Sequence, residues 1–274
     1  MKSYHIIRFA GLLMLAVSLL NLQSCKPEEI VPGIETVEIG SVEAADLGVT
    51  LVLYGEQEPF VGYNKLYARV NDTKTGKPVK HEVHVTAKPM MYMPGMTHSA
   101  PYDSEHGDAD ENDLHPFSVV FIMPSDGDMS YWEIEFELHD HEADLEQTVK
   151  LRVDVKAPAE ARMKSFITLD DSSKLFVSLA APMKPVVGIN DFALAIHKRE
   201  TMMSFPAVEG YTIEIEPEMP TMGHGSPNNV NPADMGHGHY EGKVNFTMTG
   251  LWRVHVKIKK GAVMAGETAF DITF

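Results

Sequence analysis

A six-residue pattern, Met-Pro-x-Met-x-His, occurs at residues 93–98 and again at 219–224, which is 126 positions later. The same offset relates the Val-Gly-x-Asn sequence at 61–64 to the one at 187–190, so about 40 residues keep their register without an insertion. Self-similarity at a fixed period marks repeated structural units, and a period of this size is that of a whole domain. The repeat therefore predicts that the 274-residue chain folds as two copies of one domain.

Large apolar residues alternate with charged ones in both halves. The segment 132–138 reads Trp-Glu-Ile-Glu-Phe-Glu-Leu, and 252–258 reads Trp-Arg-Val-His-Val-Lys-Ile. In a strand, such alternation places one set of side chains in a core and the other in water. Many short strands separated by turn residues favour an antiparallel sandwich. We therefore expect an all-β chain of two tandem antiparallel β-sandwich domains, with core positions that include Trp132, Ile134, Phe136, Trp252, Val254 and Val256.

The remaining strands are predicted from the same alternation, and two long segments lack it. Strands are expected at 47–54, 61–70, 79–87, 117–123, 147–155, 164–169, 174–180, 187–197, 210–216, 243–248 and 268–274. The segments 89–116 and 217–240 show no strand character, and both contain the repeated motif. Structureless loops of that length are uncommon in compact domains and are often functional. These two segments are therefore the expected functional loops.

Composition suggests the boundaries of the domains. The stretch Ala157-Pro158-Ala159-Glu160-Ala161 lacks alternation and is dominated by small residues, which is typical of a linker. We expect a signal peptide at 1–24, an acylated cysteine with its tether at 25–35, domain 1 at 36–156, the linker at 157–162 and domain 2 at 163–274.

The N-terminus has the composition of an export signal. Lys2 and Arg8 precede an apolar run at 9–20, which is shorter than a comfortable membrane span and has no stop-transfer pattern after it. Leu-Gln-Ser-Cys at 22–25 then resembles a bacterial lipobox, although Gln23 replaces the more usual small residue. We expect cleavage before Cys25 and acylation of its thiol, so that a lipid anchor makes the membrane a partner. A free thiol from a core is the alternative.

The expected location is the cell envelope, as an outer-membrane lipoprotein that faces the periplasm or the cell surface. The Lys-Pro-Glu-Glu sequence at 26–29 resembles the signals that send some lipoproteins to the surface, but it is equally typical of a solvated linker. The formal net charge of −16 is opposite to what binding to a phosphate backbone requires, so nucleic acid is excluded as an expected partner.

The two predicted loops are rich in methionine and histidine. Thioether sulfur is a soft neutral donor and imidazole is borderline, so a site without thiolate that combines them suits Cu(I) better than Zn(II), Ca(II) or Mg(II). A proline after the first Met ends strand pairing, and the flexible methionine side chain allows several sulfurs to converge. The candidate copper ligands are Met93, Met96 and His98 in domain 1, and Met219, Met222, His224, Met235, His237 and His239 in domain 2.

Domain 2 offers the more complete set of donors. We expect Met219, Met222 and His224 to be the primary ligands, with Met235, His237 or His239 completing the site from the far end of the same loop. Closing one loop costs an entropy that grows only logarithmically with its length. The alternative is that the sulfurs plug the sandwich cores and the histidines are solvated.

Two other clusters of polar residues do not predict a binding site. The acidic residues at 108–113 lack the glycine and the final glutamate of an EF-hand, so a solvated loop is the expectation. His139 and His141 lie at a predicted hairpin turn, where solvent exposure is the simplest interpretation. No nucleophile elbow, phosphate-binding glycine loop or Cys/His pair is present in the sequence, and we expect a protein that is not an enzyme.

The motif and its surroundings resemble a known family. Met-Pro-x-Met-x-His is followed in each half by Phe-x-Met, at 121–123 and 246–248, and then by an aromatic strand that begins at Trp132 or Trp252. This arrangement is similar to that of the YtkA-like family of exported bacterial Ig-like domains, which is related to the FixH-like accessory proteins. The resemblance implies an Ig-like sandwich and an association with copper handling. It suggests a lipoprotein that buffers or delivers copper with a copper-handling envelope protein as partner; a structural or protein-interaction lipoprotein is the alternative.

Overall fold

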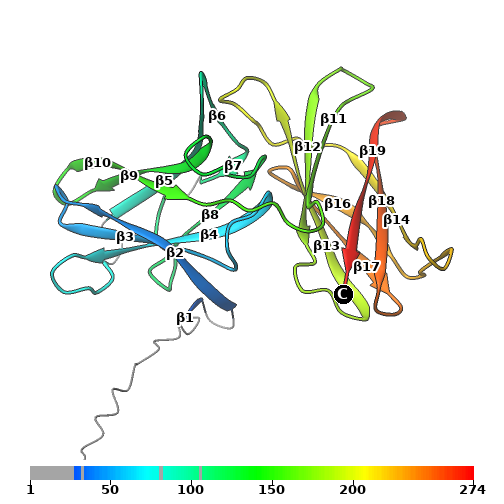
Figure 1. Cartoon of the computed structure of the whole chain (residues 1–274), viewed down its shortest axis with the longest axis horizontal. Coiled ribbons are helices and arrows are strands. Elements are labelled where there is room, and N and C mark those ends of the chain that lie inside the picture. Colours follow the sequence, from blue (N-terminus) through cyan, green and yellow to red (C-terminus); the bar gives the residue numbers. More distant parts are fainter. Residues whose placement is uncertain (1–27, 32–33, 80–82, 105–106) are drawn as a thin grey trace, which may run out of the picture.

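The computed structural model describes residues 28–31, 34–79, 83–104 and 107–274 (Figure 1). Within these ranges the chain forms nineteen β-strands and no α-helix. No helix in the described part of the chain could therefore cross a membrane. The expected signal peptide at 1–24 and the acylation site at Cys25 lie outside the described residues.

Two antiparallel sheets form a first sandwich in the N-terminal half. One sheet has the order β1-β2-β3-β4-β8-β7, and the other has the order β10-β9-β5-β6. The strands are β1 (Glu28–Val31), β2 (Ile34–Ala44), β3 (Val49–Gly55), β4 (Gly62–Asp72), β5 (Val83–Met93), β6 (Met96–Ser99), β7 (Tyr102–Asp103), β8 (His115–Phe121), β9 (Tyr131–Asp140) and β10 (Leu145–Val153).

A second sandwich in the C-terminal half repeats this arrangement. Its sheets have the orders β11-β12-β13-β17-β16 and β15-β14-β18-β19. The strands are β11 (Met163–Ile167), β12 (Lys174–Ala181), β13 (Gly188–Arg199), β14 (Thr212–Met219), β15 (His224–Gly225), β16 (Val230–Gly236), β17 (His239–Phe246), β18 (Leu251–Lys260) and β19 (Val263–Thr273). When β11 is matched to β2, every strand pairing in the second sandwich has a counterpart in the first. The prediction of two tandem Ig-like antiparallel β-sandwiches is confirmed.

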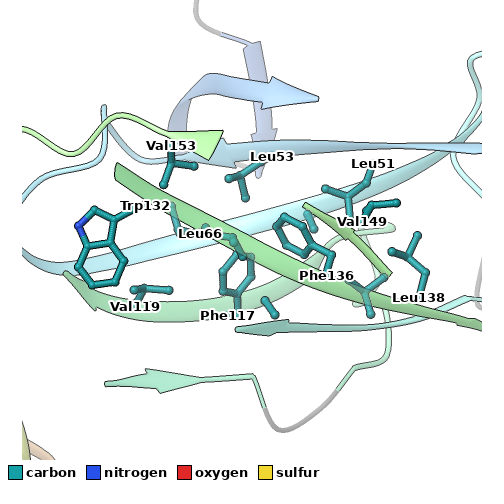
Figure 2. Packing of buried hydrophobic residues seen from close by; sticks show 14 of the residues in the cluster. Leu51, Leu53, Leu66, Phe117, Val119, Trp132, Phe136, Leu138, Val149 and Val153 are labelled. Carbon is teal, nitrogen blue, oxygen red and sulfur yellow. The ribbon is translucent and has the colours of Figure 1, made fainter. Parts of the chain in front are cut away.

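Each sandwich has its own hydrophobic core between its sheets. Figure 2 shows the first, where Trp132 and Phe136 of β9 lie among the buried apolar side chains; both, and Ile134 of the same strand, are fully buried. In the second, Trp252, Val254 and Val256 of β18 are buried in the same way. All six predicted core positions are confirmed. Burial of each large apolar side chain contributes roughly 1.5–3 kcal/mol, so the alternating strands supply much of the stability.

The repeated Val-Gly-x-Asn sequence has a local structural role. The Asn64 side chain accepts a hydrogen bond from the Phe60 N–H (3.0 Å) and donates to the carbonyls of Phe60 and Gly62 (2.8 Å each). Asn190 makes the equivalent bonds to Val186 and Gly188 at 2.8–2.9 Å. Each asparagine thereby satisfies backbone groups where its strand begins, which explains why the two halves share it.

The structure corrects the expected loops 89–116 and 217–240. In the first, β5 continues to Met93 and a Pro94-Gly95 turn leads into β6 and β7. In the second lie the end of β14, β15, β16 and the start of β17. These are mostly short edge strands, whose glycine, proline and histidine content hides the alternation. The structure also adds β2 at 34–44, which the sequence pattern did not reveal.

The two sandwiches touch along β4, β6 and their surroundings (Figure 1). The Ser99 N–H of β6 donates to the Met202 carbonyl of the second sandwich at 2.9 Å. The Tyr63 ring meets the His239 ring edge-on, with centroids 5.7 Å apart. The end of the first sandwich that carries the start of β4 and the end of β6 therefore packs against the second.

Candidate functional site

The second Met-Pro-x-Met-x-His motif forms a hairpin at one end of the second sandwich. Met219 and His224 are direct cross-strand partners in β14 and β15, so their side chains lie on the same face. Met219 is only 4% exposed and packs in the core, whereas Met222 at the turn is 58% exposed. The N–H groups of Met222 and Gly223 both donate to the Met219 carbonyl, which closes the turn. The hairpin thus carries one buried donor, one exposed donor and a half-buried imidazole.

The first motif forms the equivalent hairpin between β5 and β6. Met93 pairs with Met96, and Met91 pairs with His98, so these four side chains share one face. Met91 is buried, Met93 packs at the edge of the core, and Met96 is exposed. His98 is 3% exposed, and its Nδ1 lies 2.7 Å from the Ser99 carbonyl. Because a carbonyl only accepts, Nδ1 carries the proton and Nε2 keeps the lone pair.

A tryptophan lies next to each hairpin histidine. The ring centroids of His98 and Trp132 are 5.5 Å apart, and those of His224 and Trp252 are 6.1 Å apart, both edge-to-face. Each indole Nε1–H donates at 2.9 Å to the carbonyl of a methionine, Met123 in the first half and Met248 in the second. The Phe-x-Met and Trp segments of the repeat thus form the surface on which each hairpin packs.

Met235, His237 and His239 lie away from the other candidate ligands of the second sandwich. Met235 is on β16 and His239 begins β17, in the sheet that faces the β14–β15 sheet. The His237 N–H donates to the Glu209 carboxylate at 2.7 Å, so His237 lies near the N-terminal end of β14. Met219 is at the C-terminal end of the same strand. At about 3.3 Å per residue the two ends of β14 are roughly 20 Å apart. The structure does not bring the two groups of donors together.

A buried histidine lies on β13 of the second sandwich, where it pairs with Ala207. His197 lies on β13 beside His239, and burial, with a smaller effect from His239, lowers its pKa to about 4. Its Nδ1 has no hydrogen-bond partner. The residue 126 positions earlier is Asn71, whose side-chain oxygen is likewise buried without a partner. Burial also lowers the pKa of His239 itself.

The donor chemistry of the hairpins can be tested against metal classes. Among the described residues, no group of three or more His, Cys, Asp or Glu side chains is placed to hold a metal ion. Each hairpin instead carries methionines and one histidine, and thioether together with imidazole is a combination of donors that suits Cu(I). Sequence reasoning did not count Met248 as a donor, although it is exposed and sits in the turn below Trp252. Its recurrence as Phe-x-Met in both halves was the available signal.

Comparison with known proteins agrees with this fold. Both halves are Ig-like β-sandwiches, a class defined by the sheet order and core described above. Residues 170–257 match the YtkA-like family, so the second half carries a YtkA-like domain, and the prediction of that family is confirmed there. The matched segment includes the hairpin at 219–224 and Trp252. No curated protein matches the chain in sequence.

Several solved structures are similar over most of the chain. Domains 5–6 of the S-layer protein SbsC share 13% identity over 87% of this chain and 99% of that one, with a TM-score of 0.28. Invasin, a bacterial integrin-binding protein, shares 12% identity over 82% of this chain and 39% of its own, with a TM-score of 0.22. InvD of Yersinia pseudotuberculosis shares 12% identity over 79% of this chain and 54% of its own, with a TM-score of 0.25. At such scores the likeness carries no functional inference.

Proposed function

We propose that this chain is a non-enzymatic envelope lipoprotein that binds Cu(I) at the hairpin end of its second sandwich, for buffering the ion or delivering it to a copper-handling partner. Met219, Met222 and His224 are the proposed ligands. The observation that carries the proposal is the pairing of Met219 with His224 on one face, beside Trp252, with the exposed Met222 at the turn between them. The export-type N-terminus supports the envelope location.

Three features of the hairpin suit a soft cation. Two thioethers and one imidazole supply neutral donors that select Cu(I) over hard cations. Met222 is free of the core, so its flexible side chain turns toward an ion at little cost. The β14–β15 pairing keeps Met219 and His224 opposite each other, so that part of the ordering entropy is already spent on folding.

A structural or protein-interaction role is the second candidate, and the burial of Met219 favours it. A side chain that is 4% exposed within the core contributes to stability whether or not it binds a metal. In this role the hairpin is a packed edge of the sandwich, and the protein serves the envelope through its surface.

The two candidates are separated by titrating the full chain with Cu(I) against a chromogenic Cu(I) chelator under anaerobic conditions. Met222→Ala leaves the core intact because Met222 is exposed, and we expect it to weaken Cu(I) binding about tenfold, which is about 1.4 kcal/mol. The matched control is Met235→Ala, which removes an equally exposed methionine at the other end of the sandwich. Wild-type affinity in Met222→Ala, or an equal loss in Met235→Ala, rules out the hairpin site and leaves the structural role.

A further inference from the structure

Three histidines gather on the outer face of the first sandwich, and His84 lies at the opposite end of β5 from Met93 of the hairpin. His84 on β5 and His139 on β9 are direct cross-strand partners. Their neighbours Val83, Val85 and Leu138 point into the core, so both imidazoles project from the opposite face of the sheet. His141 follows in the turn between β9 and β10 and is exposed. Sheet pairing thus joins residues that are 55 positions apart in the sequence.

The His141 ring contacts both of the other rings. The ring centroids of His139 and His141 are 4.3 Å apart, and those of His84 and His141 are 5.1 Å apart. The side chains of His84 and His139 are 38% and 31% exposed, so an ion in solution reaches them without local unfolding. Three imidazoles at these separations repel one another when protonated, and the cluster gains no core burial in return. Packing alone therefore gives no reason for this grouping.

Carboxylates lie beside two of the three rings. The Asp108 Oδ1 is 2.8 Å from Nε2 of His84, and the Asp144 Oδ1 is 3.8 Å from Nε2 of His139. Because a carboxylate only accepts, Nε2 carries the proton in the neutral His84 ring, and the lone pair that a metal ion binds is then on Nδ1. Metal-binding histidines commonly donate their second ring N–H to such a carboxylate, which fixes the orientation of the ring.

The backbone next to Asp108 is held in place. The Gly107 carbonyl accepts a hydrogen bond from the Val85 N–H at 2.7 Å and lies 2.8 Å from Nδ1 of His115. Gly107 packs directly on the His84 ring, since a Cβ atom added there would lie 3.0 Å from it. The carboxylate that orients His84 is therefore anchored to the sheet.

We propose that His84, His139 and His141 form a binding site for a divalent transition-metal ion of the Zn(II) or Cu(II) class, with Asp108 orienting the His84 ring. Imidazole is the ligand type that these ions share, and the absence of thioether from the trio separates it from the Cu(I) hairpin. In the described residues the nitrogen atoms do not yet converge on one point. The rings must turn about their side-chain bonds, which their exposure and the position of His141 in a turn permit.

The test is a calorimetric titration of the full chain with Zn(II). We expect one tight equivalent, and His141→Ala should weaken it by about 100-fold or more, since even an outer-shell partner is worth about 10- to 100-fold. His141 is exposed, so this variant keeps the fold. Asp108→Asn should cost about 10-fold. Replacing Zn(II) by Co(II) should give the visible absorption of a nitrogen-ligated ion, and this absorption should disappear in His139→Ala.

The matched control is His255→Ala. This histidine is also on an outward-facing strand position next to a carboxylate, with Nε2 2.9 Å from Glu218, but no second imidazole lies beside it among the described contacts. His255→Ala should bind Zn(II) as the wild type does. Absence of saturable binding in the wild type, unchanged affinity in His141→Ala, or an equal loss in His255→Ala would each overturn the site. None of these outcomes depends on whether the hairpins bind Cu(I).

Discussion

The two Met-Pro-x-Met-x-His hairpins have the same place in the same fold, but the motif histidine is accessible only in the second, which we call the open hairpin; the first is the covered hairpin. In the first sandwich Ser99, next to the motif histidine, donates its N–H to the Met202 carbonyl of the second sandwich, and His98 is buried. At the equivalent place in the second sandwich, Gly225 is exposed and His224 is half-buried. A repeated motif therefore does not imply a repeated binding site, because a neighbouring domain decides whether an ion can approach it.

Replacement of each tryptophan by alanine tests whether the two cores are equivalent. Trp132→Ala and Trp252→Ala should each lower the free energy of unfolding by about 3–5 kcal/mol, because each removes a fully buried indole and its hydrogen bond to a methionine carbonyl. Urea denaturation followed by far-UV circular dichroism measures the loss. A large effect at one position and a small one at the other would show that the cores differ despite their common strand order.

Acid should distinguish the sandwiches through His197, which occupies the place of Asn71. The folded state holds its pKa near 4, below the ordinary value of about 6.5, so the unfolded chain binds the proton first. The contribution of His197 to the free energy of unfolding is constant above about pH 6.5 and falls as the pH drops toward 4. Below that pH the total loss is about 3 kcal/mol. His197→Asn copies the first half and should remove this part of the pH dependence.

The measurement is urea unfolding of wild type and His197→Asn at pH 7 and pH 4, with hydrogen exchange to locate the opening. We expect the wild type to lose more stability than the variant, with faster exchange in β12, β13 and β17. Identical pH dependence in the two proteins would contradict the assigned role of His197. The variant is needed because burial also lowers the pKa of His115 in the first sandwich, which adds its own acid sensitivity.

The smallest expected effect concerns the contact between the two sandwiches. Tyr63 packs edge-on against His239, while the residue 126 positions later, Ile189, is exposed. Tyr63→Ala should lower the unfolding free energy by about 1 kcal/mol, and Ile189→Ala should change it by less than about 0.5 kcal/mol. Thermal unfolding of the two variants compares them directly. Equal shifts would mean that the contact between the sandwiches adds nothing to stability.

The sequence predicted the fold better than the site. The alternation at 132–138 and 252–258 reports burial directly, so the class of fold and the core followed from it. The strands β6, β7, β15 and β16 were missed because edge strands need no alternating pattern. The separation of Met219 from His237 was missed for a related reason, since 217–240 is not one closed loop but crosses from one sheet to the other. The entropy of closing a single loop, from which the site was predicted, therefore does not apply to this segment.

The histidine trio shows a different limit of sequence reasoning. His139 and His141 are visible as a local pair, but His84 joins them only through the register of β5 against β9. Nothing in the local pattern around His84 fixes that register, which depends on which residues of two distant strands share the core. Clusters that form across a sheet are therefore found in the structure, whereas clusters within a turn can be found in the sequence.

The placement of the tryptophans gives the molecule a built-in optical readout. The chain has two tryptophans, one in each sandwich, and their rings lie 5.5 and 6.1 Å from the hairpin histidines. Indole emission is quenched by a nearby copper ion and shifts in colour when water enters its surroundings. Trp132→Phe leaves only the fluorophore beside the open hairpin, and Trp252→Phe leaves only the one beside the covered hairpin. Light emitted by the protein itself can therefore report which half an ion has entered, without any attached dye.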